Sequence, residues 1–420
     1  MMRIMIWFQK LNKNFNNNQG EILFLVLKYT TDRQNNFQYK LHIMKVLIDD
    51  EAFIIQKFGG VSRIFSEILK RLIKCDNQLI FYNFYSENEY LNALKLNGIK
   101  PFLKNFQFPL KGKLIRSINR FFSKPFNIKN IRYGNVNVFH SSFYSDYYLK
   151  ELERNKNVKF VFTVHDLIHE LMPEVEGNSN LANIKKKNLQ RADHIIVVSE
   201  STKSDLLKVY PFVEKNKISV IHLANSLPIE KEKVSGLPDK YVLYVGERRG
   251  YKNFIFFINA FVPFSLVYPD YKIVCTGSMN FSNSEIKLFE NLNLLSKIFH
   301  FRCNDKQLRY VYENSTMFVF PSLYEGFGLP ILEAFDCKTP VLLSNTSSLP
   351  EVGKDAALYF NPQIESELTN NMLLIANNQN LRNELIENGK KRLKDFSWDL
   401  HFKNTYSIYN SLHFENSSPQ

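Results

Sequence analysis

Two glutamates separated by seven residues are the side chains whose types and spacing point most directly to chemistry. Glu325 and Glu333 lie in the stretch PSLYEGFGLPILEAF (321–335), directly after the apolar run TMFVF (316–320). The apolar run predicts a buried strand and LPILEAF predicts a helix, so one carboxylate falls in the turn and the other within the helix. Ionised carboxylates accept hydrogen bonds from hydroxyl groups in pairs. We therefore expect each glutamate to bind a diol.

The residues between the glutamates favour an anion. Gly326 and Gly328 let the backbone approach a ligand closely, and Pro330 is tolerated in the first turn of a helix. The free N–H groups at the start of that helix favour a diphosphate. A ligand with phosphate in the middle and a diol at each end is a sugar nucleotide. A lone pair of glutamates at this spacing is more often a solvated helix face, and the glycines and the preceding strand are what favour a site.

The elements that would position these residues follow a regular alternation from Met44 onward. Apolar runs alternate with segments of helical periodicity, such as VSRIFSEILKRLI (61–73) and a helix capped by Ser199 or Ser201. Two successive series of this kind predict two doubly wound α/β domains. Ligands of such sheets lie beyond the carboxyl ends of the strands. The predicted strands are 45–48, 79–84, 137–142, 159–166, 192–199 and 217–224, then 237–246, 271–277, 298–303, 317–322 and 340–344.

Composition bounds the class of protein. The 420 residues are too many for one ordinary core, and 45% hydrophobic with 23% charged residues is ordinary for a globular protein. No uninterrupted apolar run reaches transmembrane length. The four cysteines, which have no C-x-x-C spacing, indicate reduced thiols in a cytoplasmic protein rather than a disulfide framework or a zinc site.

The net charge of +13 is concentrated in the N-terminal half. Residues 100–132 contain nine basic residues, no acidic residue and six phenylalanines. This mixture suits an anionic membrane surface, and it could also suit nucleic acid. A pair of helices with buried phenylalanines and solvated lysines is the third reading. We expect no nucleic-acid partner and keep the membrane surface as a candidate partner.

Residues 1–43 differ from the rest. They include the Asn-rich run LNKNFNNNQG and a short apolar run with no small-residue cleavage site after it. Because MKVLIDDEAF at Met44 is a typical start of an α/β protein, we predict that residues 1–43 are a non-native or disordered extension. The acidic IDDE (48–51) could be read as metal ligands, but its place at a strand end favours capping or solvation.

Four stretches together resemble glycosyltransferase family 4, the retaining transferases of the GT-B fold. They are EGFGLPILEA (325–334), RADHIIVVSESTKSDL (191–206), YVLYVGERRGYKNF (241–254) and SLPEVGKDAALYFNP (348–362). The resemblance covers nearly everything from Met44 to about Trp398. The HDL and SSLPEVG variants are most similar to the mannosyltransferase-like branch that builds surface polysaccharides. VGERRG is not G-x-G-x-x-G, so a dinucleotide cofactor is not expected.

The resemblance implies roles for the matching residues of the C-terminal half. Glu325 would contact the donor sugar and stabilise charge near its anomeric carbon, and Glu333 would hold the ribose hydroxyls. Lys252 would neutralise the leaving diphosphate. Sugar hydroxyls or phosphate would meet the backbone at Phe327, Gly328 and Leu329.

The arginine that accompanies this lysine in the family is ambiguous here. The common pattern places it directly after the glycine, where this chain has Glu247. We choose Arg248, with Arg249 second. The chain also has Lys338 where family members often have glycine, which touches no proposed charge role.

The resemblance also implies two parts of the donor site in the N-terminal half, a glycine loop and a histidine. KFGGVSRIF (57–65) resembles the family's first glycine loop, in which Gly59 and Gly60 give the diphosphate access to backbone. The resemblance implies that His165, in FTVHDL, would face the donor sugar near the reaction centre, while Asp166 would only orient a loop.

These inferences give one expected architecture and activity. We expect a GT-B fold of two Rossmann-like domains facing a cleft: an acceptor-binding domain (44–230), a nucleotide-sugar-binding domain (237–395) and a C-terminal helix (396–415) crossing back to the first. The expected activity is metal-independent, retaining transfer of a hexose from GDP-mannose or a UDP-sugar to a glycan or lipid-linked acceptor. The enzyme would be cytoplasmic or peripheral on the inner membrane face. A sugar-nucleotide epimerase of the same architecture and a non-catalytic nucleotide-sugar-binding protein are the alternatives.

Overall fold

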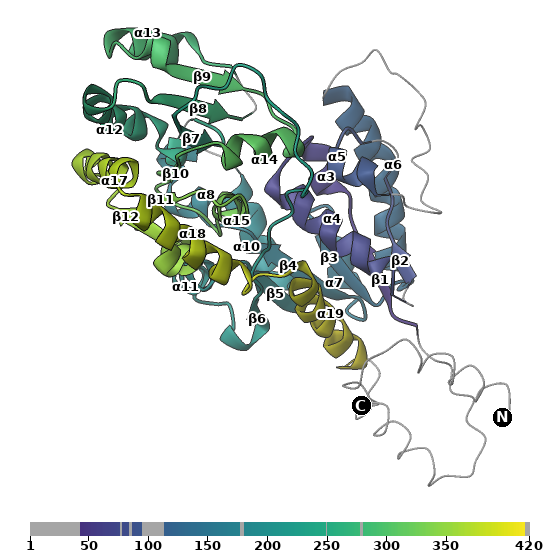
Figure 1. The fold of residues 1–420 in the computed structure, drawn as a ribbon. Helices are drawn as coiled ribbons and strands as arrows, with labels where there is room; N and C mark the ends of the chain where they lie inside the picture. The colour runs from purple at the N-terminus through teal and green to yellow at the C-terminus, as the bar shows by residue number, and fades with distance from the viewer. Residues whose placement is uncertain are drawn as a thin grey trace, which may run out of the picture. The chain divides into compact units, whose positions relative to one another are not determined.

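The computed structural model describes residues 43–75, 78–83, 86–94, 113–176, 180–248, 250–277 and 280–415. Most of the predicted extension, Arg249 and residues 100–112 of the basic segment lie outside this description. Residues 43–420 form one unit by their internal contacts. Within it the strands form two six-stranded sheets, and every strand pairing is parallel (Figure 1).

The first sheet has the order β2-β1-β3-β4-β5-β6. Its strands are β1 (Lys45–Ile48), β2 (Gln78–Ile80), β3 (Val138–Ser141), β4 (Lys159–Val164), β5 (His194–Val197) and β6 (Ile218–Val220). Its connecting helices are α3 (Glu51–Ile55), α4 (Gly60–Leu72), α5 (Glu89–Ala93), α6 (Lys113–Arg132), α7 (Leu149–Arg154), α8 (Ile168–Leu171), α9 (Pro173–Glu176), α10 (Leu181–Arg191) and α11 (Glu200–Val209), with a 3-10 turn η1 (Lys215–Lys217).

The second sheet has the order β12-β11-β10-β7-β8-β9. Its strands are β7 (Tyr241–Val245), β8 (Lys272–Thr276), β9 (Ile298–Phe301), β10 (Met317–Phe320), β11 (Val341–Ser344) and β12 (Ala357–Phe360). Its helices are α12 (Phe254–Val267), α13 (Asn283–Asn291), α14 (Asp305–Glu313), α15 (Leu329–Asp336), α16 (Leu349–Gly353), α17 (Glu365–Asn377) and α18 (Gln379–Leu393), with 3-10 turns η2 (Gly250–Lys252), η3 (Leu295–Lys297) and η4 (Lys354–Ala356).

The expected α/β class, with two sheets of parallel strands, is confirmed. All strands of the first sheet fall within 44–230 and all strands of the second within 237–395. The strand β12 is not among those that the sequence predicts, although its residues lie in one of the family-like stretches. The strand expected over 79–84 is shorter, since β2 ends at Ile80.

One apolar cluster joins the two halves. It includes Val46 and Phe65 from the first sheet and its helix α4, and Phe318 and Leu343 from the second sheet. Each sheet packs a separate cluster on its other face. Burying apolar surface on both faces is what parallel sheets require, and the shared cluster keeps the two halves in contact.

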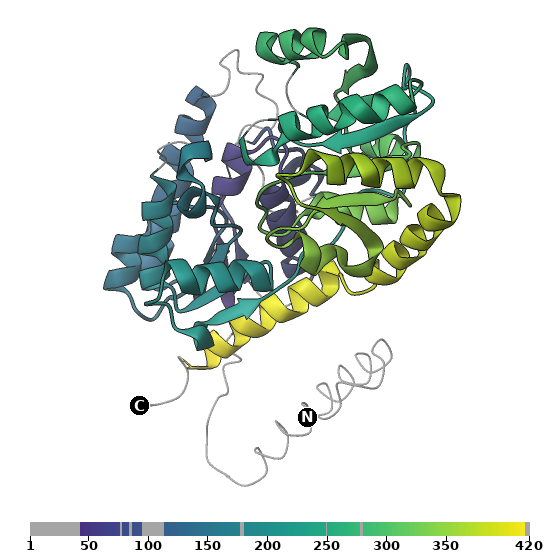
Figure 2. The same cartoon turned by 90° about the vertical axis from the view of Figure 1, so that its left-hand side faces the viewer.

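The C-terminal helix α19 (Trp398–Glu415) packs on α4 and β3 of the first sheet, as expected for a helix that crosses back. Figure 2 shows this helix, in yellow, running from the second half toward the first. Its Tyr409 hydroxyl lies 2.6 Å from Nδ1 of the buried His140 on β3. Near its start, Trp398 Nε1 donates a hydrogen bond of 2.9 Å to the Asn225 carbonyl.

The expectation of solvated acids at the end of β1 is wrong. Asp49, Asp50 and Glu51 are all buried. Asp49 accepts hydrogen bonds from the N–H (2.7 Å) and hydroxyl (2.6 Å) of Ser142. Asp50 stands at the N-cap position of α3 without a side-chain capping bond and accepts one from Ser123 of α6 (2.9 Å). These buried acids therefore connect the first sheet to its helices through hydrogen bonds.

The helix α6 buries its polar side and exposes phenylalanines. Ser123 and Asn127 are fully buried, whereas Phe121 is 74% exposed and Phe126 is 43% exposed. The reading in which the phenylalanines of this segment are core is therefore wrong for these two residues. The reason is that the opposite side of the helix lies on the buried acids Asp50 and Glu51. That side therefore carries the polar and basic groups that bind these acids, including Arg120, which lies 2.9 Å from Glu51.

One stretch of the described chain, Gly250–Val267, is long and apolar enough to cross a membrane by length and composition alone. It contains α12, whose phenylalanines belong to the apolar cluster of the second sheet. This packing is what a core helix of a sheet domain shows, and it accounts for the composition without a membrane.

Candidate active site

Lys252 and Glu325 meet at the carboxyl edge of the second sheet. Lys252 ends the turn η2 that follows β7, and Glu325 lies in the loop between β10 and α15. The Lys252 Nζ atom lies 2.7 Å from Glu325 Oε1. Because β7 and β10 are neighbours in the sheet, their carboxyl ends bring these two predicted residues together.

The loop that carries Glu325 is held on both sides by hydroxyl groups. The Glu325 N–H donates to Ser347 Oγ at 2.9 Å, and Ser348 Oγ donates to the Glu325 carbonyl at 2.9 Å. From the first half, Ser199 and Thr202 of α11 donate to the Gly326 carbonyl at 2.7 and 3.1 Å. The backbone of this loop is thereby fixed by both halves of the chain.

His165 lies against the same loop through its backbone carbonyl. A Cβ atom on Gly326 would fall 1.7 Å from the His165 carbonyl oxygen, so only glycine fits there. The imidazole Nδ1 is buried and makes no hydrogen bond within the described residues. Burial lowers the pKa of His165 to about 4, so the ring is neutral at pH 7. Asp166 accepts the Ile168 N–H at 3.2 Å, which orients the following turn.

The glycine loop of the first half faces the start of α15. Gly59 and Gly60 lie at the N-terminus of α4, and a Cβ on Gly60 would lie 3.5 Å from the Leu329 side chain. Gly328 has φ +99° at the N-cap of α15, a conformation that favours glycine, and Phe327 beside it is buried. The two glycine-containing helix starts that were predicted to bind phosphate therefore lie next to each other.

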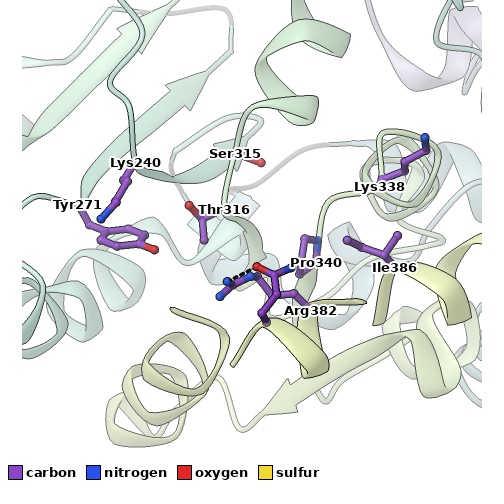
Figure 3. A pocket seen from close by; sticks show the side chains of 9 residues that line it. Lys240, Tyr271, Ser315, Thr316, Lys338, Pro340, Arg382 and Ile386 are labelled. Carbon is purple, nitrogen blue, oxygen red and sulfur yellow. Dashed lines mark hydrogen bonds between the residues drawn. The ribbon is translucent and has the colours of Figure 1, made fainter. Parts of the chain in front are cut away.

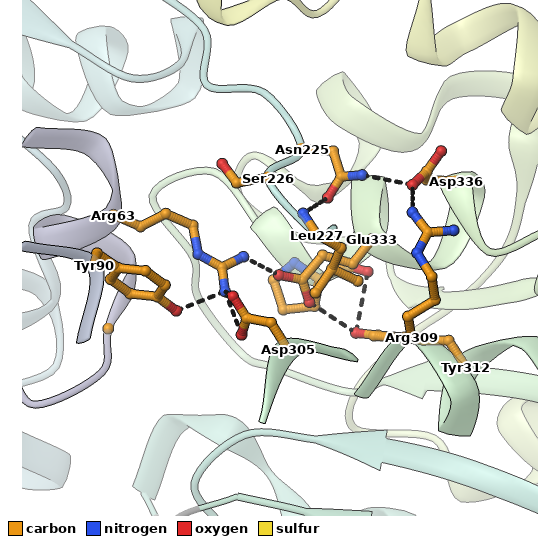
Figure 4. A network of polar contacts seen from close by, with 12 residues as sticks. Arg63, Tyr90, Asn225, Ser226, Leu227, Asp305, Arg309, Tyr312, Glu333 and Asp336 are labelled. Carbon is orange, nitrogen blue, oxygen red and sulfur yellow. Dashed lines mark hydrogen bonds and ion pairs between the residues drawn. The ribbon is translucent and has the colours of Figure 1, made fainter. Parts of the chain in front are cut away.

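Glu333 is buried on α15 and is bound from both halves (Figure 4). Arg63 of α4 donates to its Oε1 at 2.7 Å, and the Tyr312 hydroxyl lies 3.2 Å from its Oε2. The same guanidinium contacts Asp305 at 3.0 Å and the Tyr90 hydroxyl at 2.7 Å. The residue predicted to hold ribose hydroxyls thus already lies in a polar network.

Arg248 is not brought together with Lys252 and Glu325 in the contacts that the structure gives. Its Nε lies 2.8 Å from Glu285 Oε1, its Nη2 donates to the Asn280 carbonyl at 2.9 Å, and its guanidinium lies over the Phe281 ring at 4.7 Å. In this structure its Nε and Nη2 atoms are directed to Glu285 and Asn280. Its alternative, Arg249, lies outside the described residues.

A pocket at the opposite edge of the second sheet has no part in this arrangement (Figure 3). Lys240, Tyr271, Thr316 and Pro340, which line it, each directly precede a strand. The pocket therefore lies at the amino ends of the strands, whereas ligands of doubly wound sheets bind beyond the carboxyl ends.

Sequence reasoning missed the residues that hold the site in place. Ser199, Ser348 and Arg63 all lie within stretches that carry the family resemblance, but their spacing gave no sign of their partners, which for Ser199 and Arg63 lie in the other half. Arg63 falls on the polar face of its helix, beside Glu67 and Lys70, so the apolar pattern carried no sign of its burial. No group of three or more metal-ligating side chains occurs in the described part of the chain.

Two family models match the chain, one in each half. The model described as Glycosyltransferase Family 4 matches residues 58–224, and the model described as Glycosyl transferases group 1 matches residues 228–392. The chain therefore belongs to the family 4-like glycosyltransferases of the GT-B fold. It is a transferase.

Relatives of known name point to the same family. The chain is 27% identical to O-antigen chain mannosyltransferase B of Escherichia coli over 60% of this chain and 70% of that protein. It is 29% identical to O-antigen chain mannosyltransferase RfbU of Salmonella typhimurium over 52% of this chain and 65% of that protein.

Solved structures share the fold. A glycosyltransferase from Rickettsia africae matches with a TM-score of 0.66 at 19% identity, covering 88% of this chain and 99% of that one. The Anabaena protein HepE in complex with UDP-glucose matches with a TM-score of 0.68 at 14% identity, covering 88% of this chain and all of that one.

Proposed function

We propose that this enzyme transfers a hexose from GDP-mannose or a UDP-sugar to a glycan or lipid-linked acceptor in surface polysaccharide biosynthesis, with retention of anomeric configuration. The observation that carries the proposal is the contact of 2.7 Å between Lys252 and Glu325 at the carboxyl edge of the second sheet. The O-antigen mannosyltransferases among its relatives support the class of product.

The proposed reaction needs charge at two places. The bond between the anomeric carbon and the phosphate oxygen breaks, and the bond from the acceptor oxygen forms on the same face. The acceptor proton passes to the departing phosphate. Lys252 stabilises the negative charge of the nucleoside diphosphate, and Glu325 stabilises positive charge developing at the sugar. No protein nucleophile is required.

The remaining predicted residues bind the donor in this proposal. Glu333 accepts the ribose hydroxyls, and the N–H groups at the starts of α4 and α15 face the diphosphate. The neutral His165 imidazole hydrogen-bonds the sugar. Because Lys252 supplies the positive charge, we propose that transfer is metal-independent, so a chelator should leave the rate unchanged and added Mg²⁺ should not raise it.

A thermal-shift panel on the full chain tests donor binding. The ligands are GDP-mannose, UDP-glucose, UDP-GlcNAc, GDP and UDP, and a ligand that binds only the folded state raises the melting temperature. We expect a shift with one nucleotide family, lost in Glu333→Ala. Release of the nucleoside diphosphate and transfer of the sugar then test catalysis. A folded protein that shifts with none of the five ligands would contradict the proposed donor.

We also propose that α6 contacts an anionic membrane surface, where a lipid-linked acceptor would lie. The exposed Phe121 and Phe126 share this helix with the exposed Lys129, and the combination suits lipid headgroups.

Sedimentation with phosphatidylglycerol vesicles tests the membrane contact. Binding should fall with added salt and fall further in Phe121→Ser. Phe212→Ser is the matched control, because Phe212 is another exposed phenylalanine, 47% exposed, outside α6. Equal binding to phosphatidylcholine vesicles, or equal loss in both variants, would contradict the contact.

A further inference from the structure

Arg63 connects the two halves of the enzyme at the residue proposed to bind ribose. It comes from α4, while Glu333 comes from α15 of the second sheet, and Nη1 lies 2.7 Å from Glu333 Oε1. Both side chains are buried, with 8% of each exposed. A charge removed from water needs a partner and further hydrogen bonds. Arg63 meets this need with Tyr90 at 2.7 Å and Asp305 at 3.0 Å (Figure 4).

Because the guanidinium of Arg63 is planar, it holds several acceptors in fixed directions, which a single point charge would not do. Its Nη1 binds Glu333, while its Nη2 binds both oxygens of Asp305 and the Tyr90 hydroxyl. A fork of fixed donors holds several acceptors in set directions. The Glu333 carboxylate is therefore oriented from the first half of the chain.

The bound Glu333 still has acceptor capacity for a diol. A carboxylate offers about four acceptor positions, of which Arg63 takes one on Oε1 and the Tyr312 hydroxyl one on Oε2. One acceptor position remains on each oxygen, which is the number that the pair of hydroxyls of a ribose needs. Arg63 can therefore stay in place while the donor binds.

We propose that Arg63 is a positioning residue for the donor: from the first half of the chain it holds the Glu333 carboxylate in the orientation that receives the ribose hydroxyls. The inference rests on the proposed function, because it concerns the same donor site. Its consequence is that donor affinity depends on contact between the two halves, since the ribose site in the second half is completed by a side chain of the first.

The charges around Glu333 support this role. Burial raises the pKa of Glu333, and the charge of Arg63 is the largest effect that opposes the rise. Without Arg63 the carboxyl would hold its proton to a higher pH, and a protonated carboxyl accepts fewer hydroxyl hydrogen bonds. The titratable groups that face the pair are Asp305 and Tyr312 of α14, Tyr90 of α5 and Cys337 after α15.

The test measures nucleotide affinity in full-length Arg63→Met, Arg63→Lys and Arg71→Met proteins by calorimetry. Arg71 is the matched control, because it is also on α4 and also pairs with the second half of the sequence, through Asp399 at 2.8 Å, but away from Glu333. The probes are GDP, UDP and their 2′-deoxy counterparts, at pH 6 to 8.5. Thermal melts of each variant confirm folding.

We expect the wild type to bind GDP or UDP about tenfold or more tightly than the 2′-deoxy form, as a hydrogen bond to a charged group implies. Arg63→Met should lose most of that preference and regain affinity as the pH rises, because Glu333 then ionises. Arg63→Lys should retain part of it, and Arg71→Met should match the wild type. A loss of packing alone would produce no recovery with pH.

A double-mutant cycle with Glu333→Gln measures whether Arg63 acts on nucleotide affinity through Glu333. If Arg63 acts through Glu333, Arg63→Met should change affinity little in the Glu333→Gln protein. An equal loss in both backgrounds, or no loss in either, would overturn the role of Arg63 while leaving the proposed function intact. Failure of the wild type to bind any of the nucleotides would overturn both.

Discussion

Gly326 shows how little room the site leaves for other residues. A methyl group there would overlap the His165 carbonyl, at 1.7 Å. The glycine between the two glutamates was expected to admit a ligand to the backbone, but in the structure it admits the backbone of the other half. The same glycine therefore brings Glu325 and His165 to one place.

Lys252→Ala should strongly lower the rate of transfer while leaving the fold intact. The lysine is the cation in contact with Glu325, and loss of a group that stabilises transition-state charge lowers kcat by about 100-fold or more. Steady-state kinetics with the donor found by the thermal-shift panel measures this. Lys240→Ala is the control, because Lys240 pairs with Asp270 at the amino edge of the same sheet. Equal activity of both variants would remove Lys252 from the site.

Asp49→Asn should become more stable relative to the wild type as the pH rises. Burial, and next the charge of Glu51, raise the pKa of Asp49 to about 7. A raised pKa in the folded state means that stability is lost as pH climbs from about 4 through 7, by up to roughly 1.4 kcal/mol per pH unit. Asparagine does not titrate and so escapes this loss. Urea melts of both proteins at pH 5 and pH 8 measure it, and an unchanged difference would contradict the raised pKa.

The family-like stretch 191–206 contains the first turn of α11, and the structure shows what this turn contacts. Ser199 caps the helix by accepting the Thr202 N–H at 3.0 Å. The two hydroxyls then donate to Gly326, and Asp205 accepts from Tyr324 at 2.8 Å. This turn is therefore a docking site for the loop that carries Glu325.

Thr202→Val should slow transfer without weakening nucleotide binding. Valine has the same shape but leaves the buried Gly326 carbonyl with Ser199 as its remaining side-chain donor, a loss of one hydrogen bond worth about 0.5–1.5 kcal/mol. We expect a rate up to about tenfold lower, with an unchanged thermal shift for the nucleotide. Ser201→Ala, in the same turn, is the control. A fall in nucleotide affinity with an unchanged rate would show that α11 does not position the loop.

The sequence predicted elements better than it predicted their contacts. The repeated apolar runs located eleven of the twelve strands that the described residues form, because buried parallel strands are continuous in hydrophobicity. One of the interpretations has the phenylalanines of α6 buried, but the buried side of this helix is polar. That burial depends on the acidic cluster beneath the helix, which the sequence pattern does not reveal. Arg63 and Ser199 both lie in stretches that carry the family resemblance. Their partners are distant in the sequence, and a single sequence without relatives does not show which distant residues are in contact.

The two halves are joined by a shared core and by α19. The Tyr409 hydroxyl reaches His140, a residue whose pKa burial lowers to about 3. The neutral ring contacts Thr163 at 2.8 Å on its other side. The C-terminal helix is thereby tied to the middle of the first sheet.

Tyr409→Phe should lower the free energy of unfolding by about 1–3 kcal/mol, because His140 Nδ1 loses its partner in a buried site. The melting temperature should fall, and the transition should stay single because the halves share one core. Differential scanning calorimetry measures both. An unchanged melting temperature would show that the hydrogen bond does not contribute.

The central claim concerns where a nucleotide sugar binds between the two sheets. A crystal structure with the nucleotide sugar that gives the largest thermal shift tests it most directly. We predict the diphosphate within hydrogen-bond distance of Lys252 Nζ and the ribose hydroxyls on Glu333, with Arg63 still on that carboxylate. A nucleotide bound elsewhere, such as in the pocket beside Lys240 and Lys338, would contradict the account.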